Sequence, residues 1–389
     1  MERLLLRNVL HDRRTRNILI EGNRFKDLDA PEEVADARVL DASGTAILPA
    51  LYNAHTHAAM TLLRGYADDM PLQKWLQEYI WPFEDKLTPA DIRHGSELAA
   101  REMVESGSVF FNDMYFDIEE TIDVVDRSGM RAAIGVTVMD IHSKAVSEGK
   151  KEFVRQWHDP TGGRIRLLMA PHSVYTVGEK RLRDCAEFAR ENGMLLHIHL
   201  SETLTEVEDC IKEHGVSPVR YLDSIGFLGP DVIAAHCVHV DDEEADILAE
   251  RGVTVVHCPC SNMKLGSGSF PDRRMMSAGC RITLGTDGAS SGNNLDLREA
   301  MKFAALLAKV GGDPELLPAE EVFRWATQCG AEAFGLDAGV IAEGRLADCL
   351  LIDLSDIRMQ PCHHLVSNFV YAADSRCIKH VLCDGKVIR

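Results

Sequence analysis

Two histidines separated by one residue, His55 and His57, end an apolar run that begins at Leu51. In an extended strand, residues i and i+2 point to the same side, so both imidazoles would converge on one point. Imidazole nitrogens are common ligands of zinc and other transition metals. A chain with 16 histidines forms such pairs by chance, so this pair predicts a metal site only if matching ligands follow downstream.

Further ionisable side chains follow other apolar segments that have the character of buried strands. In chain order these groups are His197, His199, Glu202, His236 and Asp287. His197 and His199 form a second His-x-His pair, and Glu202 lies three residues beyond it. The recurrence of imidazole and carboxylate groups at strand ends indicates one site that several strands build together.

The elements that must position these groups alternate short apolar runs with amphipathic segments. Continuous apolar runs are typical of parallel strands that are covered on both faces, and residues 90–106 and 179–192 have the spacing of helices. The strand candidates are residues 46–53, 109–113, 131–138, 164–170, 194–200, 232–235, 253–258 and 281–286. This pattern predicts a (β/α)8 barrel, whose active site lies at the C-terminal ends of its strands.

The ligand pattern resembles that of the amidohydrolase superfamily, and longer motifs resemble its 5′-methylthioadenosine/S-adenosylhomocysteine deaminase family. These motifs are spread over nearly the whole chain and occupy residues 53–57, 60–65, 171–173, 236–239, 261–266 and 285–289. The same group contains related aminohydrolases and triazine hydrolases. The resemblance is therefore specific for the fold and the chemistry, and less specific for the substrate.

Both ends of the chain alternate apolar and polar residues in short pieces, as at residues 18–23 and 344–353. Such pieces, joined by Gly and Asp turns, are typical of short β-strands. In the amidohydrolases that the chain resembles, these flanks meet in a small β-sandwich beside the barrel. We therefore expect a composite domain of residues 1–48 and 338–389, and a catalytic barrel of residues 49–337.

The resemblance implies one divalent metal ion, held by a water molecule and four protein ligands: His55, His57, His199 and Asp287. Dinuclear relatives carry a bridging ligand, often a carboxylated Lys, after strand 4, and residues 164–173 contain no Lys. Zinc is the default for imidazole and carboxylate ligands, and Fe²⁺ or Mn²⁺ fits the same donors. The family spacing His-x-x-Glu selects His199 as the ligand and leaves His197 as a packed residue of the barrel interior.

The resemblance also implies hydrolytic deamination of an adenine ring by a metal-bound hydroxide. A bound metal lowers the pKa of water from about 15.7 toward 7. Glu202 would then act as general acid/base between the water and ring N1, His236 would hold the hydroxide, and Asp287 would pass a proton to the departing amine. Taken alone, Glu202 would be a carboxylate in the first turn of a helix and His236 a core histidine.

Three residues are candidates for reading the nucleoside. Glu84 matches the position that accepts hydrogen bonds from the ribose hydroxyls in nucleoside-using relatives, and the alternative is a solvated loop carboxylate before a helix. His172 is expected near a ring nitrogen or the ribose. Trp75 would cover the nucleoside or pack in the core.

One departure from the family bears on the 5′ group. Relatives that accept S-adenosylhomocysteine use arginines after strand 3 to bind its carboxylate, and residues 134–140 contain none. Lys144, Lys150 or Lys151 would be a poorer substitute, because an ammonium lacks the bidentate fork of a guanidinium. We therefore predict 5′-methylthioadenosine, adenosine or 5′-deoxyadenosine as substrates in preference to S-adenosylhomocysteine.

Composition narrows the remaining classes. A formal net charge of −19 disfavours nucleic-acid binding. We expect neither a signal peptide nor a membrane span, because the first residues form no extended apolar run and no long uncharged apolar stretch occurs. Eleven scattered cysteines favour a reducing cytoplasm, with Cys258 and Cys260 as buried thiols. Relatives commonly form homo-oligomers. The alternatives are an aminohydrolase of guanine, a pterin or a triazine, and a metal-binding scaffold without turnover.

Overall fold

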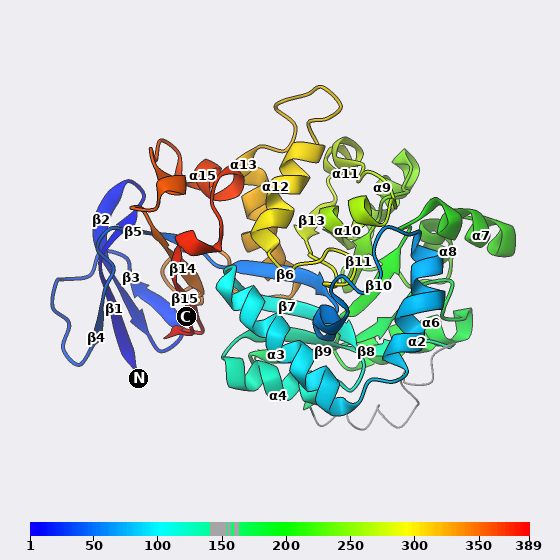
Figure 1. Cartoon of the computed structure of the whole chain (residues 1–389), viewed down its shortest axis with the longest axis horizontal. Helices are drawn as coiled ribbons and strands as arrows, with labels where there is room; N and C mark the ends of the chain where they lie inside the picture. Colours follow the sequence, from blue (N-terminus) through cyan, green and yellow to red (C-terminus); the bar gives the residue numbers. More distant parts are fainter. Residues whose placement is uncertain (141–153, 155–156, 159–162) are drawn as a thin grey trace.

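The computed structural model of the chain describes residues 1–140, 154, 157–158 and 163–389. This part contains two eight-stranded sheets that lie beside each other (Figure 1). One sheet is a parallel barrel surrounded by helices, and the other is built from both ends of the chain. The predicted (β/α)8 barrel with an accessory β domain from the two termini is confirmed.

The barrel strands pair in parallel and in chain order. They are β6 (Leu51–Thr56), β7 (Ser108–Tyr115), β8 (Arg131–Val138), β9 (Ile165–Pro171), β10 (Leu196–Leu200), β11 (Val232–His236), β12 (Thr254–His257) and β13 (Arg281–Leu284). Most of their side chains are buried, because the inner face fills the barrel and the outer face packs on helices. Above the seam between β13 and β6, the Asp287 N–H donates to the His55 carbonyl at 3.0 Å.

The first predicted strand, residues 46–53, is wrong in its bounds because the chain changes sheet within it. β5 (Thr45–Pro49) pairs antiparallel with β14 (Cys349–Asp353) in the terminal sheet, whereas β6 begins the barrel at Leu51. A single residue, Ala50, separates the two strands. The apolar run is continuous across this point, so hydrophobic pattern alone does not reveal the change.

Helices cover the outer face of the barrel between its strands. They are α3 (Pro89–Glu105), α4 (Ile118–Ser128), α6 (Glu179–Glu191), α7 (Leu204–His214), α8 (Pro218–Ser224), α9 (Asp242–Glu250), α10 (Pro259–Lys264), α11 (Asp272–Ala278), α12 (Leu297–Leu307), α13 (Ala319–Arg324) and α14 (Gly330–Ala333). Local sequence sets several of their starts: Thr88 and Asp91 form a reciprocal capping box around Pro89 at the first position of α3. None of the helices in the described part has both the length and the apolarity needed to cross a membrane.

The segment after β6 covers the mouth of the barrel. It contains a 3₁₀ helix (Ala58–Leu63), α1 (Leu72–Lys74), a π-helical turn (Trp75–Ile80) and α2 (Trp81–Glu84). An apolar cluster that includes Trp75, Tyr115 and Met139 packs this segment onto the ends of β7 and β8. Apolar burial therefore fixes a lid of local helices over the site, although the individual helices are too short to be stable alone.

The terminal sheet joins strands from the two ends of the chain. Its further strands are β1 (Arg3–His11), β2 (Arg14–Glu21), β3 (Arg24–Asp27), β4 (Arg38–Asp41), β15 (Ile378–Cys383) and β16 (Lys386–Val387). Their order is β16-β15-β14-β5-β1-β2-β3, with β4 beside β1. The sheet has an apolar core of its own, which draws on Leu6, Ile18, Ile47 and Leu351. Helix α15 (Leu365–Tyr371) packs against α12 and α13 of the barrel.

A buried ion pair joins the barrel to the terminal sheet. Arg131, at the start of β8, donates from Nε to Asp348 at 2.9 Å and also pairs with Asp384. Asp348 is fully buried and accepts a further hydrogen bond from the Tyr52 hydroxyl at 2.7 Å. Because each charge has several partners, the cost of burying the network is largely offset.

Candidate active site

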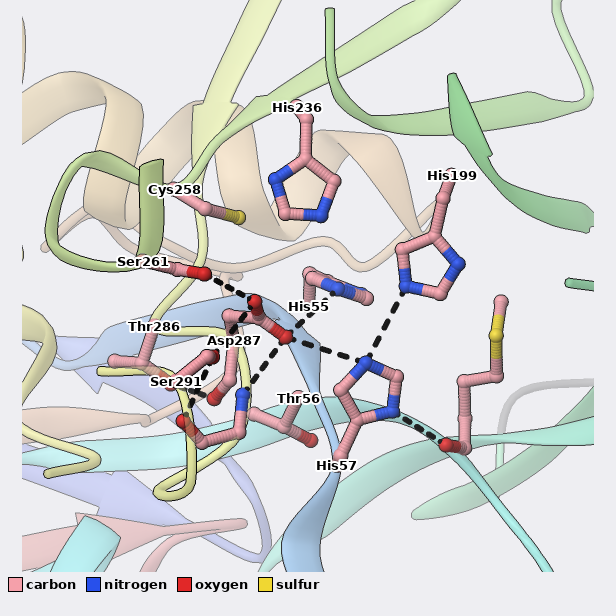
Figure 2. A network of polar contacts seen from close by, with 12 residues as sticks. His55, Thr56, His57, His199, His236, Cys258, Ser261, Thr286, Asp287 and Ser291 are labelled. Carbon is pink, nitrogen blue, oxygen red and sulfur yellow. Dashed lines mark hydrogen bonds and ion pairs between the residues drawn. The ribbon is translucent and has the colours of Figure 1, made fainter. Parts of the chain in front are cut away.

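The predicted ligands converge at the C-terminal ends of the barrel strands (Figure 2). His55 lies on β6 and His57 directly after it, His199 lies on β10, and Asp287 follows β13. Asp287 Oδ1 lies 3.3 Å from His55 Nε2 and 3.2 Å from His57 Nε2, and the Nε2 atoms of His57 and His199 are 3.3 Å apart. The close approach of β13 to β6 requires Gly285, because a Cβ there would lie 2.8 Å from the Cβ of His55.

Hydrogen bonds at Nδ1 orient the three imidazoles. His57 Nδ1 donates to the Met114 carbonyl at 2.7 Å, and His199 Nδ1 donates to the His172 carbonyl at 2.8 Å. Since a carbonyl only accepts, each ring carries a proton on Nδ1, which leaves Nε2 as the atom that can ligate a cation. This arrangement of outer partners is typical of metal-binding histidines.

The proton of His55 is also held on Nδ1, in this case by a second histidine. His197 Nδ1 donates to the Ile233 carbonyl at 2.9 Å, which leaves its Nε2 as an acceptor for His55 Nδ1 at 2.8 Å. His197 is fully buried inside the barrel, so it contacts His55 and does not join the converging atoms. The Nε2 atom of His55 is buried and has no hydrogen-bond partner within the described residues.

The donor set fits a cation. The Nε2 atoms of His57 and His199 lie 3.3 Å apart, and an Asp287 carboxylate oxygen lies at a similar distance from the Nε2 atoms of His55 and His57, so nitrogen donors and a negative charge face one point. Burial lowers the pKa of His55 to about 4 and the pKa of His199 well below its ordinary range, so both rings are neutral at pH 7. Burial also lowers the pKa of His57, but the hydrogen bond and charge of Asp287 outweigh it and raise that pKa to about 9.

Asp287 is held from its outer side by two hydroxyls. Its Oδ2 accepts from Ser261 at 2.6 Å and from Ser291 at 2.9 Å, while Oδ1 accepts from the Gly288 N–H at 2.8 Å (Figure 2). Burial opposes its ionisation, yet the neighbouring rings of His55 and His57 hold the pKa of Asp287 well below its usual range. The carboxylate is therefore ionised and aimed at the imidazoles.

Glu202 and His236 lie beside the converging atoms. The structure places His236 Nε2 3.9 Å from Glu202 Oε2, and the Ser267 hydroxyl donates to Glu202 Oε1 at 3.3 Å. Burial raises the pKa of Glu202, and the neighbouring His236 partly opposes this shift. A carboxyl group with a raised pKa can both give and take a proton near neutral pH, as general acid/base chemistry requires.

Two carboxylates that the sequence analysis missed shape the backbone of the site. Both oxygens of Glu206 accept backbone hydrogen bonds, from Ser201 and Glu202, each at 2.8 Å. Asp113 on β7 accepts from the Ala58 N–H at 2.6 Å and so fixes the turn after His57. Burial raises the pKa of Glu206 to about 7 and that of Asp113 to about 6. Apart from their acidic side chains, no sequence signal distinguishes them.

A cavity of about 610 Å³, including space open to solvent, extends from the converging atoms beneath the lid. Glu84, His172 and Trp75 all line it, so the structure brings the three predicted substrate readers to the same space. Trp75 is also part of the apolar cluster of the lid. His172 Nδ1 lies 3.0 Å from the Thr176 hydroxyl, which orients its ring.

Neutral residues that the sequence analysis missed complete the wall. Tyr115, Tyr175 and Thr137 line the cavity, and the other lining residues are mainly Met, Leu, Trp and Phe. Burial and the charge of Glu84 raise the pKa of Tyr115 well above its ordinary value, so its hydroxyl remains a donor. The described lining contains the carboxylates Glu84, Glu202 and Asp287 and no Lys or Arg.

The two cysteines of the Cys-x-Cys pair differ in exposure. Cys258 is buried next to the site, and Cys260 is half-buried (Figure 2). Burial raises the pKa of Cys258 well above its ordinary value and that of Cys260 to about 12, so both are protonated thiols. All eleven cysteines are free.

Comparisons with known proteins agree with this geometry. The sequence pattern of the amidohydrolase family matches residues 46–388. The 5′-deoxyadenosine deaminase of Methanothermobacter thermautotrophicus is 43% identical, over 96% of this chain and 88% of that protein. The 5-methylthioadenosine/S-adenosylhomocysteine deaminase 1 of Archaeoglobus fulgidus is 46% identical, over 96% of this chain and 89% of that protein.

Solved structures extend the similarity to the fold. An adenosine deaminase from Xanthomonas campestris with bound zinc has a TM-score of 0.91 and 34% identity, over 99% of this chain and 92% of that one. A guanine deaminase from C. acetobutylicum, solved with guanine in its active site, has a TM-score of 0.88 at 22% identity, over 100% of this chain and 99% of that one. The second similarity concerns the fold alone.

Proposed function

Because this chain belongs to the amidohydrolase family, we propose that it is an aminohydrolase that deaminates adenine nucleosides to the inosine analogue and ammonia. The observation that carries the proposal is that one cavity contains both the groups for the chemical step and a candidate for binding the ribose. The converging imidazoles and Asp287 lie at its base together with Glu202, and Glu84 lies in its wall. The names of the two relatives reported above, both deaminases of adenosine analogues, support the same substrate class.

The proposed cofactor is one divalent metal ion, with His55, His57, His199 and Asp287 as its protein ligands. Zinc is the proposed ion, supported by the zinc in the Xanthomonas adenosine deaminase and by the nitrogen-rich donor set, although Fe²⁺ and Mn²⁺ suit the same ligands. When bound, the metal lowers the pKa of a coordinated water toward 7. β9 and the two residues after it contain no Lys, which favours a single ion.

The chain's own residues then move the protons. Glu202 accepts a proton from the attacking water and donates it to ring N1 as the water oxygen bonds to C6. Its raised pKa suits both steps, because the carboxyl group must be ionised at first and protonated afterwards. His236 would hold the water by a hydrogen bond. Asp287 passes the remaining water proton to the amine, which leaves as ammonia.

Glu84, His172 and Trp75 are proposed to bind the nucleoside. The carboxylate of Glu84 can accept both hydroxyls of a ribose, because two acceptor oxygens meet two donors. The described cavity wall offers the 5′ group apolar side chains and no cation, which suits a methylthio, hydroxyl or deoxy group better than a charged amino acid. The three lysines that could contribute a cation, Lys144, Lys150 and Lys151, lie outside the described residues.

The test is ammonia release from a panel of ring substrates by zinc-loaded protein. The panel contains adenosine, 5′-methylthioadenosine, 5′-deoxyadenosine, S-adenosylhomocysteine, adenine, guanine and a triazine, with Glu202→Gln as the control. We expect activity on the nucleosides that is lost in the control. Activity confined to free bases or triazines would refute the substrate class, and Glu84→Ala would then have no effect because there is no ribose to hold.

A further inference from the structure

Two polar side chains of helix α10 contact residues of the site. The helix follows β12 directly, and its third and fourth residues are Ser261 and Asn262. Ser261 donates to Asp287, whereas Asn262 Oδ1 lies 2.9 Å from His236 Nδ1. Both Asn262 and His236 are 1% exposed, so no solvent competes for this contact. The motif at residues 261–266 therefore supplies one partner for Asp287 and one for His236.

The role of His236 depends on which of its nitrogens carries the proton. A water held by a cation presents only its hydrogens to its surroundings, so a neighbour that holds this water must be an acceptor. His236 Nε2 lies 3.9 Å from Glu202 Oε2, and a nitrogen of the His236 ring lies within 4.8 Å of a His55 nitrogen and an Asp287 oxygen. An Nε2 lone pair there accepts a hydrogen bond, whereas an Nε2 proton would be directed at the cation and at its water.

We propose that Asn262 is a positioning residue that keeps His236 in the Nδ1–H tautomer, so that Nε2 stays free to accept a hydrogen bond from the attacking water. This inference rests on the proposed deamination. The other imidazoles of the site, those of His57, His197 and His199, donate from Nδ1 to backbone carbonyls, which have only one possible role. His236 instead meets a side-chain amide, which can present either an acceptor or a donor.

Two features support the amide oxygen as the facing atom. The Asn262 Nδ2 group is buried and has no hydrogen-bond partner within the described residues, so the site retains an unsatisfied donor in order to place Oδ1 against His236. The backbone of His236 is left-handed, with φ of +73°, and its ring therefore does not gain its direction from a regular strand. The ring also contacts Glu202 and stacks on His199, and the contact with Asn262 is the hydrogen bond at Nδ1.

The direct test is the imidazole nitrogen spectrum of the zinc-loaded, ¹⁵N-histidine-labelled protein. His236→Gln identifies the signals by their loss. We expect two-bond ¹H–¹⁵N correlations in which Nδ1 of His236 is protonated and Nε2 is not. The opposite pattern, with the proton on Nε2, would overturn the proposal. This readout does not need turnover, so it decides the inference even if no nucleoside in the panel is deaminated.

The kinetic test compares Asn262→Leu, which removes the acceptor at similar size, with Asn262→Asp, which keeps an acceptor and cannot donate. From the usual effect of removing an outer hydrogen-bond partner, we expect Asn262→Leu to lower kcat about 10–100-fold with KM and zinc affinity changed less than about threefold. Asn262→Asp should recover about tenfold of that loss. Asn112→Leu is the matched control, because it removes another fully buried amide, one that donates to the Ala54 carbonyl instead.

Three kinetic results would overturn the proposal. The first is a kcat for folded Asn262→Leu that equals that of Asn112→Leu. The second is a loss of zinc affinity as large as the loss of kcat, which would mean that Asn262 acts through the metal ligands. The third is an Asn262→Asp variant no better than Asn262→Leu. If Asn262→Leu fails to fold, the tautomer spectra of the wild-type protein and of Asn262→Asp decide the question.

Discussion

The two hydroxyls on Asp287 should be worth a measurable part of the metal affinity. Ser261 and Ser291 both donate to Oδ2, while Oδ1 faces His55 and His57. A hydrogen bond to a charged group contributes about 1.5–3 kcal/mol, and about 1.4 kcal/mol corresponds to a tenfold change in affinity. Ser261→Ala or Ser291→Ala leaves one hydroxyl in place, so each should weaken zinc binding about tenfold, and the double variant about 100-fold or more.

An opposing effect makes this prediction informative. Hydroxyl donors withdraw electron density from a carboxylate, and their removal would by itself strengthen the bond from Asp287 to a metal. We expect orientation to dominate, because Asp287 has a left-handed backbone, with φ of +63°, and its carboxylate is buried. Among the residues that the structure describes, Oδ2 of Asp287 has no hydrogen-bond partner besides these two hydroxyls.

The assay is competition for zinc against a chromophoric chelator, with zinc content checked by elemental analysis. Ser290→Ala is the control, since its hydroxyl lies one residue from Ser291 and contacts the sulfur of Met60 at 3.0 Å and not Asp287. Unchanged or tighter zinc binding in the double variant, with the control at wild-type affinity, would refute the reasoning. It would mean that the strand ends alone determine the geometry.

Three further predictions concern the substrate, the pH dependence of stability and the joint between the sheets. The catalytic efficiency on 5′-methylthioadenosine should exceed that on S-adenosylhomocysteine, because the described wall has no cation for the amino-acid carboxylate; equal efficiencies in the ammonia assay would contradict this. Burial raises the pKa of Asp272 to about 7, so the folded state retains a proton there that the unfolded state releases near pH 3.8. Its contribution to stability is present below pH 3.8 and lost as the pH rises to 7, and Asp272→Asn should reduce the fall in urea-unfolding free energy between pH 5 and 8; equal falls would refute the shift. Arg131→Met should destabilise the fold by about 3–5 kcal/mol, because it leaves the fully buried Asp348 without its cation, and Arg131→Met/Asp348→Asn should regain part of this loss in the same assay. A loss below about 1 kcal/mol in Arg131→Met, as for an exposed pair, would show that the network is solvated.

The sequence was sufficient where local pattern and chemistry coincide. Apolar runs that alternate with amphipathic segments identified the barrel strands β7 to β13 within a few residues, and the ends of four predicted strands gave the groups that the structure brings together. Parallel strands place their C-terminal ends at the same edge, so chemistry at those ends needs no knowledge of tertiary contacts. Glu84, His172 and Trp75 could be placed only through family resemblance, because they come from loops whose paths the local pattern does not determine.

The outer partners of the site were not predictable in this way. Ser261 holds Asp287, Asn262 contacts His236, and Glu206 fixes the backbone of Ser201 through contacts made across the fold or around a tight turn. Ser, Asn and Glu occur throughout the chain, and only the folded structure shows which of them are buried beside the ligands. The sequence also did not predict the change of sheet at Ala50, because the strands that pair with β5 and β6 lie far away in the chain.

The strained positions of the backbone connect the fold to the chemistry. Ser201, His236 and Cys237 have φ of +49°, +73° and +47°, a region that residues other than Gly, Asn and Asp adopt at a cost. Such conformations cost about 1–3 kcal/mol each and persist where surrounding contacts impose them. Here the contacts are backbone hydrogen bonds, since Cys237 N–H donates to the Leu200 carbonyl at 2.9 Å and Val238 N–H to the Ser201 carbonyl at 3.0 Å. They tie the ends of β10 and β11 together, so the pairing of the barrel strands stabilises the turns that bring Glu202 and His236 within 3.9 Å of each other.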